Sequence, residues 1–276
     1  MDRPRALKII ADEAARGELA FPTSFRVALK VKEALDDPDC HIDTAARVVQ
    51  SEPLLAAKAV AIANSLAYNR SGREITQVRA AISRLGFPAL RCLATAMAAR
   101  QMAGALCRPD HRALAEQLWE HTTQVAALAR VIARRVTRLD PETALFAGIV
   151  HEVGCFYLLS RLGRYPSLLE EAPADSAGGE EEICRAVLKA LGVPASIRAA
   201  MEDFWPGYQA LPPRSLADTL LLADSLTSTR SPRRQLRDGG PQPAATIDMA
   251  VGEETLAGIL EESADEVQSL IAALKF

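Results

Sequence analysis

Apolar side chains recur along this chain at intervals of three and four residues, the period of a helix that buries one face. Val27, Val31 and Leu35 form one such stripe, and the turn-forming sequence Asp36-Asp37-Pro38-Asp39 ends it. Stretches in which apolar and polar residues alternate, which are typical of strands, do not stand out, and Ala and Leu dominate. The pattern predicts an all-α protein.

Start and stop signals divide this pattern into separate helices. Gly86 and Pro88 interrupt one stripe, Asp140-Pro141-Glu142 opens another that passes through Glu152, and Ser215 with Asp218 has the spacing of a capping box. The predicted helices cover residues 27–35, 54–64, 78–85, 88–102, 111–136, 141–159, 183–191, 194–205, 216–226, 253–261 and 264–274. A short helix capped by Asp43, a cap at Ser263, and loops over 172–179 and 229–246 complete the prediction. The residues predicted to be buried are Leu54, Ile62, Ile82, Leu85, Leu114, Leu118, Val125, Ile149 and Phe156.

Composition narrows the class of protein. The 276 residues are 49% hydrophobic and 24% charged, as in globular proteins, and the net charge of −3 argues against a general nucleic-acid binder. The purely apolar runs are too short for a membrane span, and the charged N-terminus does not resemble a secretory signal. The five cysteines are widely spaced and include no C-x-x-C pair, so we expect buried thiols in a reducing compartment, the cytoplasm.

Four ionisable residues coincide with the apolar stripes. His121, Glu152 and Asp224 lie on faces that must turn inward, and His151 adjoins Glu152. Because burying such groups is costly unless they pair or bind metal, we expect them to lie close together. Imidazole and carboxylate suit a divalent ion such as Zn, Mn or Fe, whereas a hydrogen-bonded core without metal is the alternative.

At these residues the sequence resembles a known family. His121, then His151 and Glu152 in GIVHEVG, then Asp224 in LADSL follow the H…HD…D layout of the HD phosphohydrolase superfamily. The segments SEPLLAAKAVAIANSLAY and ITQVRAAISRLGFPALRCLA resemble the N-terminal half of HDOD proteins, the HD-related output domains of bacterial signalling. The resemblance runs from about Phe21 to Leu226, and the last two predicted helices are similar to those often appended to such domains.

The resemblance implies a two-lobed helical fold whose second lobe is a degenerate HD domain. It divides the chain into a helical extension over 1–20, an N-terminal lobe over 21–105, an HD-like lobe over 106–228, and a flexible loop with two helices over 229–276. Glu152 replaces the HD aspartate, Cys155 stands where active relatives carry lysine, and no histidine follows His151. These departures indicate that hydrolysis has been lost.

We therefore expect a non-catalytic bacterial regulatory module that binds a signalling protein or a nucleotide ligand, with no membrane or nucleic-acid partner. A metal-dependent phosphohydrolase and a cyclic-dinucleotide sensor without hydrolysis are the alternatives. No cofactor is expected, or else one divalent transition metal held by His121, His151, Glu152 and Asp224. The candidate partner- or ligand-binding residues are Asn64, Ser65, Arg230, Arg233 and Arg234.

Overall fold

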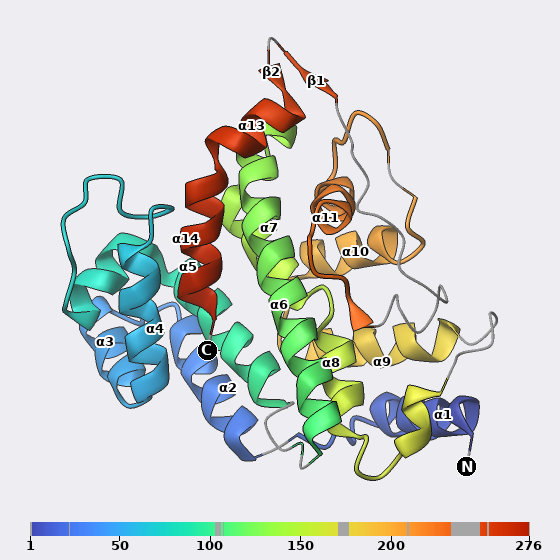
Figure 1. Ribbon diagram of the computed structural model, residues 1–276. Helices are drawn as coiled ribbons and strands as arrows, with labels where there is room; N and C mark the ends of the chain where they lie inside the picture. Colours follow the sequence, from blue (N-terminus) through green and yellow to red (C-terminus); the bar gives the residue numbers. More distant parts are fainter. Residues whose placement is uncertain are drawn as a thin grey trace.

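The computed structural model is helical throughout, apart from one short hairpin, among the residues that it describes (Figure 1). These are residues 2–21, 23–102, 106, 108–170, 177–208, 210–232, 249–252 and 254–275. The helices are α1 (Arg3–Ala15), α2 (Thr23–Asp36), α3 (Ile42–Gln50), α4 (Pro53–Asn64), α5 (Val78–Met102), α6 (Pro109–Ile132), η2 (Ala133–Thr137), α7 (Pro141–Val150), α8 (Val153–Ser160), η3 (Pro166–Leu169), α9 (Ala177–Ala190), α10 (Ala195–Phe204), α11 (Leu216–Ser225), α13 (Leu256–Glu262) and α14 (Ala264–Leu274). The all-α prediction is confirmed.

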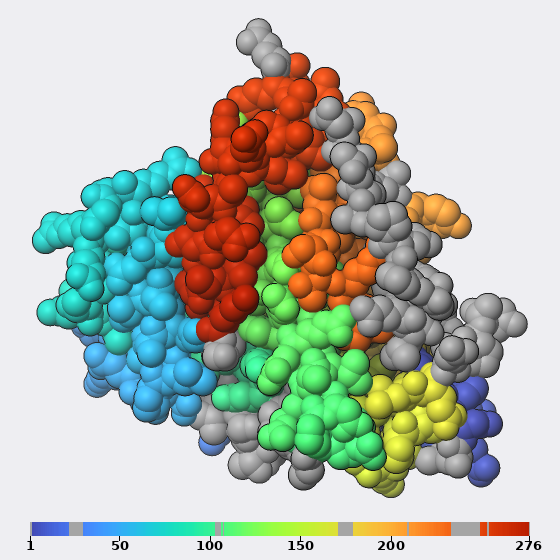
Figure 2. All heavy atoms as spheres, viewed as in Figure 1, coloured from blue at the N-terminus to red at the C-terminus, as the bar shows by residue number. Residues whose placement is uncertain are grey.

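The helices form two groups with one continuous apolar core. α2, α3 and α4 pack on α5, while α7, α11 and the C-terminal helix α14 pack on α6. α14 also contacts α4, so it lies between the two groups (Figure 1). Figure 2 shows α14 at the surface between the blue N-terminal helices and green α6. The chain is therefore two-lobed, with its last helix bridging the lobes.

An ion-pair network holds the start of α14 between the two groups of helices. Glu266 accepts from Arg130 at 2.7 Å and from both terminal nitrogens of Arg134 at 2.9 Å. Arg130 also donates to Glu142, and its guanidinium lies 4.7 Å from the centre of the Tyr68 ring. Because Tyr68 belongs to the first lobe and Glu142 to the second, Arg130 joins both lobes to α14.

Several helix boundaries follow the local signals in the sequence. Gly86 has a φ of 75°, which a residue with a side chain rarely adopts, and this break divides α5 before Pro88. Asp140 caps α7 through the Thr143 amide, and the Ser215–Asp218 capping box is complete. These interactions lie within one turn of sequence, which is why spacing alone predicted them.

Other predictions are wrong. The stripe from Pro141 does not form one helix, because Glu152 has φ −113° and ψ 20° and separates α7 from α8. α9 begins at Ala177, inside the predicted 172–179 loop, and residues 171–176 lie outside the described part. The hairpin of β1 (Ala250–Val251) and β2 (Glu254–Thr255) was not predicted.

Local caps and helix phase account for the remaining differences. His41, not Asp43, is the N-cap of α3, and Ser263 makes no side-chain cap bond to α14. Leu54 is 48% exposed because the inward face of α4 is set by Leu55, and Leu114 is only partly buried. The other residues predicted to be buried are buried.

The stretch Pro141–Ser160 is long and apolar enough to cross a membrane, but 78% of it is buried within the protein. It consists of α7 and α8, which pack on α6 and α9. The apolar core therefore accounts for its hydropathy.

Candidate metal centre

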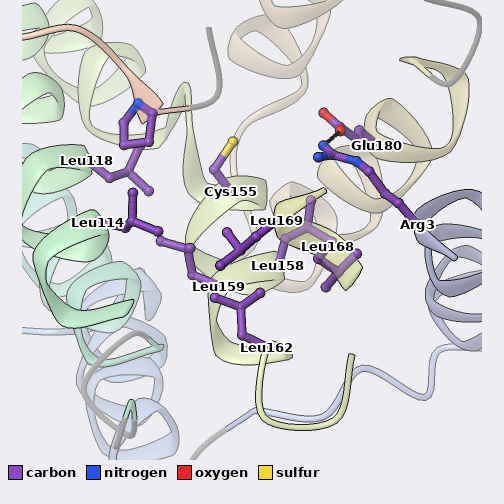
Figure 3. A pocket seen from close by; sticks show the side chains of 11 residues that line it. Arg3, Leu114, Leu118, Cys155, Leu158, Leu159, Leu162, Leu168, Leu169 and Glu180 are labelled. Carbon is purple, nitrogen blue, oxygen red and sulfur yellow. Dashed lines mark hydrogen bonds and ion pairs between the residues drawn. The ribbon is translucent and has the colours of Figure 1, made fainter. Parts of the chain in front are cut away.

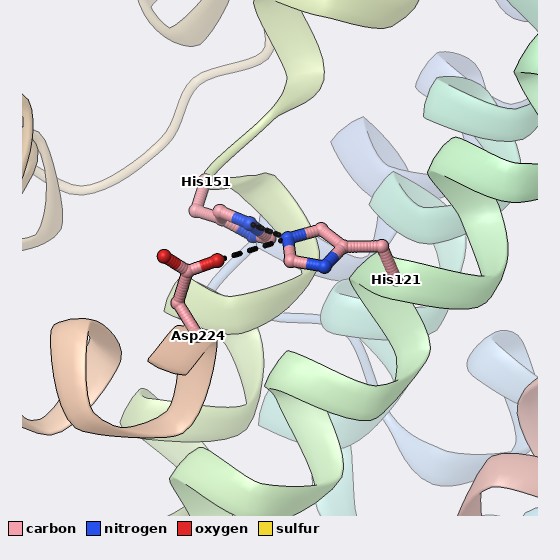
Figure 4. Close-up of side chains that lie close together, drawn as sticks. All are labelled: His121, His151 and Asp224. Carbon is pink, nitrogen blue, oxygen red and sulfur yellow. Dashed lines mark hydrogen bonds and ion pairs between the residues drawn. The ribbon is translucent and has the colours of Figure 1, made fainter. Parts of the chain in front are cut away.

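Three of the four predicted site residues meet at one point in the second lobe (Figure 4). His121 lies in α6, His151 directly follows α7, and Asp224 lies in the last turn of α11. The Nε2 atom of His121 is 3.2 Å from Oδ1 of Asp224 and 3.3 Å from Nε2 of His151. Helices separated by as many as 103 residues in sequence therefore bring three donor atoms together, all within 4.8 Å of one another.

Backbone carbonyls fix the orientation of both imidazole rings. Nδ1 of His121 is 2.9 Å from the Thr229 carbonyl oxygen, and Nδ1 of His151 is 2.7 Å from that of Gly148. A carbonyl oxygen only accepts hydrogen bonds, so each Nδ1 carries the hydrogen and donates it. Both Nε2 atoms consequently face the centre of the cluster. There they can bind a metal through their lone pairs, or share one proton between them.

The electrostatic surroundings assign that proton to His121. Burial alone lowers the pKa of His121, but the hydrogen bond to Asp224 and the charges of Glu152 and Asp224 outweigh it, so the pKa is raised. Burial lowers the pKa of His151, and the neighbouring His121 lowers it further against the opposing charge of Glu152. Without a metal, these opposite pKa shifts favour the proton on His121 over His151.

Glu152, the fourth predicted ligand, does not join the cluster of donor atoms. The Ser231 hydroxyl donates its one hydrogen to the Glu152 carboxylate, and its oxygen lies 2.6 Å and 2.7 Å from the two carboxylate oxygens. The break between α7 and α8 leaves Glu152 outside the helix, where its longer side chain reaches the segment after α11. Both residues are buried, so this bond is shielded from water.

The donor set fits one divalent transition metal. Two ligand atoms about 2.1 Å from one ion are about 3.0 Å apart at a right angle and about 3.4 Å apart at the tetrahedral angle. The 3.2 Å and 3.3 Å separations that involve His121 fall in this range, and the third pair, His151 and Asp224, lies within 4.8 Å. Two nitrogens and one carboxylate oxygen suit Zn, Mn or Fe, whereas two ions would need more ligands than these three residues offer.

The segment that follows α11 closes the cluster, a role that the sequence pattern did not predict. Thr227 donates to the Asp224 carbonyl oxygen, and the Gln124 side chain holds the amides of Ser228 and Thr229. Thr229 and Ser231 then provide partners for His121 and Glu152. The predicted loop over 229–246 is thus ordered at its start, while residues 233–248 lie outside the described part.

None of the other candidate binding residues belongs to the His121, His151 and Asp224 cluster: Asn64 and Ser65 end α4, Arg230 lies between Thr229 and Ser231, and Arg233 and Arg234 lie outside the described part. The Asn64 amide clamps the backbone of Ile75, donating to its oxygen at 2.6 Å and accepting from its nitrogen at 2.8 Å. Ser65 donates to the Ile62 carbonyl oxygen and is buried. Arg230 is partly exposed, whereas Arg233 and Arg234 are not described. Asn64 and Ser65 thus have structural roles, and partner contact at these positions stays a prediction.

Comparisons with known proteins point to one family. Residues 21–197 match the family described as the HDOD domain, a range that includes His121, His151 and Glu152 and ends before Asp224. No curated protein matches the chain.

Three solved structures share the fold. A proposed metal-dependent phosphohydrolase from Shewanella amazonensis is 18% identical, with a TM-score of 0.68 and 98% of each chain covered. An HDOD domain protein of unknown function from Geobacter sulfurreducens is 20% identical, with a TM-score of 0.57, 98% of this chain and 97% of that chain covered. A proposed signal transduction protein from Marinobacter aquaeolei is 20% identical, with a TM-score of 0.56; the match covers 99% of this chain but 66% of that one. At these identities the likeness concerns the fold.

Proposed function

Because this chain belongs to the HDOD domain family, we propose that it is a bacterial signalling module that works in the cytoplasm by binding a partner protein or ligand, without hydrolysing a phosphate ester. The helical likeness to a proposed signal transduction protein supports the signalling part of this proposal. The site supports the absence of hydrolysis.

The engagement of Glu152 by Ser231 is the observation that carries the proposal. The carboxylate at the position of the HD aspartate is bonded to a serine hydroxyl, not to the His121, His151 and Asp224 cluster. The three remaining donors are buried, with side chains of His121 and Asp224 only 1% and 4% exposed. Hydrolysis assisted by a metal needs an accessible coordination position for water and substrate, and the burial of all three donors supports our proposal that substrate does not reach an ion held there.

Metal-dependent phosphohydrolase activity is the competing function, because one relative of the same fold carries that description. His121, His151 and Asp224 would hold the ion, which would supply a Lewis acid able to polarise a phosphate oxygen or acidify a water molecule. His121 and His151 would each contribute Nε2, since their Nδ1 atoms donate to carbonyl oxygens. We propose that any such ion is single and does not support turnover.

Purified protein loaded with Mn or Fe and desalted tests both functions. We expect at most one equivalent of metal per chain by elemental analysis, and no turnover of linear phosphodiesters or cyclic dinucleotides above the rate of the buffer. Turnover that His151→Ala abolishes and His111→Ala preserves would show that the chain is an enzyme. His111 is the matched control because it is also a buried histidine of α6.

Calorimetry with the same cyclic dinucleotides separates the two kinds of binding module. Heat of binding without turnover would identify a nucleotide sensor, whereas no heat of binding would favour a protein partner. A partner captured from the source cytoplasm and then shown to bind the purified chain would establish that function directly.

A further inference from the structure

A narrow apolar pocket lies in the second lobe beside α1 (Figure 3). Leucines form its walls: Leu114 and Leu118 of α6, Leu158 of α8, Leu162 of the turn after α8, and Leu168 of η3. Its volume is about 60 Å³, several times the 10–15 Å³ that one water molecule needs, yet its walls provide few polar atoms to bind water. The pocket has room for the end of an aliphatic chain.

One charged pair lies among these apolar walls. Arg3 donates to Glu180 at 2.5 Å and to the Glu170 carbonyl oxygen at 2.6 Å, and the side chains of Arg3 and Glu180 are 6% and 5% exposed. The Nε atom of Arg3 is also buried, and it has no acceptor among the residues that the structure describes. A buried donor without an acceptor costs free energy that a ligand oxygen can recover.

The pair also defines which head group the pocket suits. A carboxylate placed there would be repelled by Glu180, and an ammonium group would be repelled by Arg3. An uncharged group with one donor and one acceptor complements the pair, because it can accept from Arg3 and donate to Glu180. We propose that this pocket binds uncharged aliphatic molecules whose head group is a hydroxyl or primary amide, with the chain among the leucines and the head at Arg3 and Glu180.

The pocket is distinct from the candidate metal centre, although they are neighbours. Leu118 lies one helical turn before His121, and the wall residue Pro232 follows Ser231. None of His121, His151 or Asp224 lines the pocket. Binding of an aliphatic alcohol therefore neither requires a metal nor depends on whether the chain hydrolyses phosphodiesters.

Titration with linear alcohols from butanol to octanol, followed through methyl NMR signals of labelled leucines, tests the proposal. We expect shifts centred on Leu114, Leu118, Leu158 and Leu168, and affinity that rises about fourfold per added methylene until the pocket is full. Hexanoate and hexylamine should bind at least tenfold more weakly than hexanol. Shifts spread over surface leucines, no binding by any alcohol, or equal affinity for the charged molecules would overturn the proposal.

Two variants test the walls and the charged pair separately. Leu158→Phe fills the pocket and should weaken hexanol binding at least tenfold, whereas Leu54→Phe, the same change on the surface, should leave it unaltered. Glu180→Gln keeps an acceptor but removes the negative charge, so it should bring hexanoate to within about threefold of hexanol. Unchanged hexanol binding in a folded Leu158→Phe protein would contradict the proposed binding site. An unchanged preference for hexanol over hexanoate in Glu180→Gln would contradict the role of the charged pair. If either variant fails to fold, the NMR titration of the unmodified chain decides.

Discussion

His121 and His151 point their Nε2 atoms at each other across 3.3 Å, while the Nδ1 atom of each ring donates to a backbone carbonyl oxygen. Two lone pairs facing each other at this distance would repel, so the contact needs a proton or a metal between the rings. Asp224, 3.2 Å from His121, stabilises either one. The pair is therefore stable only in a charged form, and the two candidate functions differ in what supplies that charge.

The first prediction concerns the proton on His121. Its pKa is raised above 6.5 in the folded protein, so the folded state holds this proton more tightly than the unfolded state. The resulting stabilisation is complete below about pH 6.5 and is lost as the pH rises through the raised folded pKa. The lowered pKa of His151 acts with the opposite sign, and its contribution is fully present above about pH 6.5.

Urea unfolding in EDTA, between about pH 7 and 9, measures this effect. The difference in free energy of unfolding between the unmodified chain and His121→Gln should shrink as the pH rises. A difference that stays constant over this range would show that His121 is not the protonated ring.

The second prediction concerns Glu266, which anchors α14 between the lobes. Glu266→Gln removes the carboxylate that pairs with Arg134 and leaves Arg130 with Glu142 alone. Removing one partner of a buried ion pair costs about 3–5 kcal/mol, and we expect the lower end because the Glu266 side chain is 14% exposed. Glu18→Gln is the control, since its pair with Arg16 is exposed and should contribute less than about 1 kcal/mol. Equal effects of the two substitutions in urea unfolding would remove the anchoring role of Glu266.

The third prediction compares two leucines that the sequence pattern treated alike. Leu118 is 1% exposed, and Leu118→Ala should cost about 2–5 kcal/mol of the free energy of unfolding. Leu54 is 48% exposed, and Leu54→Ala should change it by less than about 0.5 kcal/mol. Similar losses for both variants would contradict the observed phase of α4.

These leucines show how far the apolar pattern predicts the fold. Periodicity places α4 correctly, but a phase error of one residue turns Leu54 outward in place of Leu55, because adjacent residues differ by about 100° around a helix. The Ser215–Asp218 cap and the break at Gly86 were predictable because every contact is local. The helix break at Glu152 was not, since its side-chain partner Ser231 lies 79 residues away.

The candidate site also has features that the sequence pattern predicts and features that depend on distant contacts. The inward faces of α6 and α11 place His121 and Asp224 toward the core, so their proximity could be predicted from periodicity. The departure of Glu152 depends on the segment after α11, whose sequence is typical of a loop. Asn64 matched a family motif, but its clamp on Ile75 became visible only in the structure.

The last prediction concerns the close approach of α6 and α7 that positions His151. A Cβ atom at Gly148 would lie 2.5 Å from Cα and 2.9 Å from N of Ala126, and a backbone cannot yield as a flexible side chain can. Gly148→Ala would gain up to about 1 kcal/mol of helix propensity, but separating the helices should make it destabilising by about 1–3 kcal/mol or more. Because the Gly148 carbonyl oxygen accepts from His151, the same shift should move the His151 ring and broaden or displace its NMR signals. Gly163→Ala is the matched control, since no atom of the described residues beyond its two chain neighbours lies within 4 Å of its added Cβ, and it should stay within about 0.5 kcal/mol of the unmodified chain. A Gly148→Ala protein with unaltered stability and unaltered His151 signals would show that this helix contact does not position the candidate metal centre.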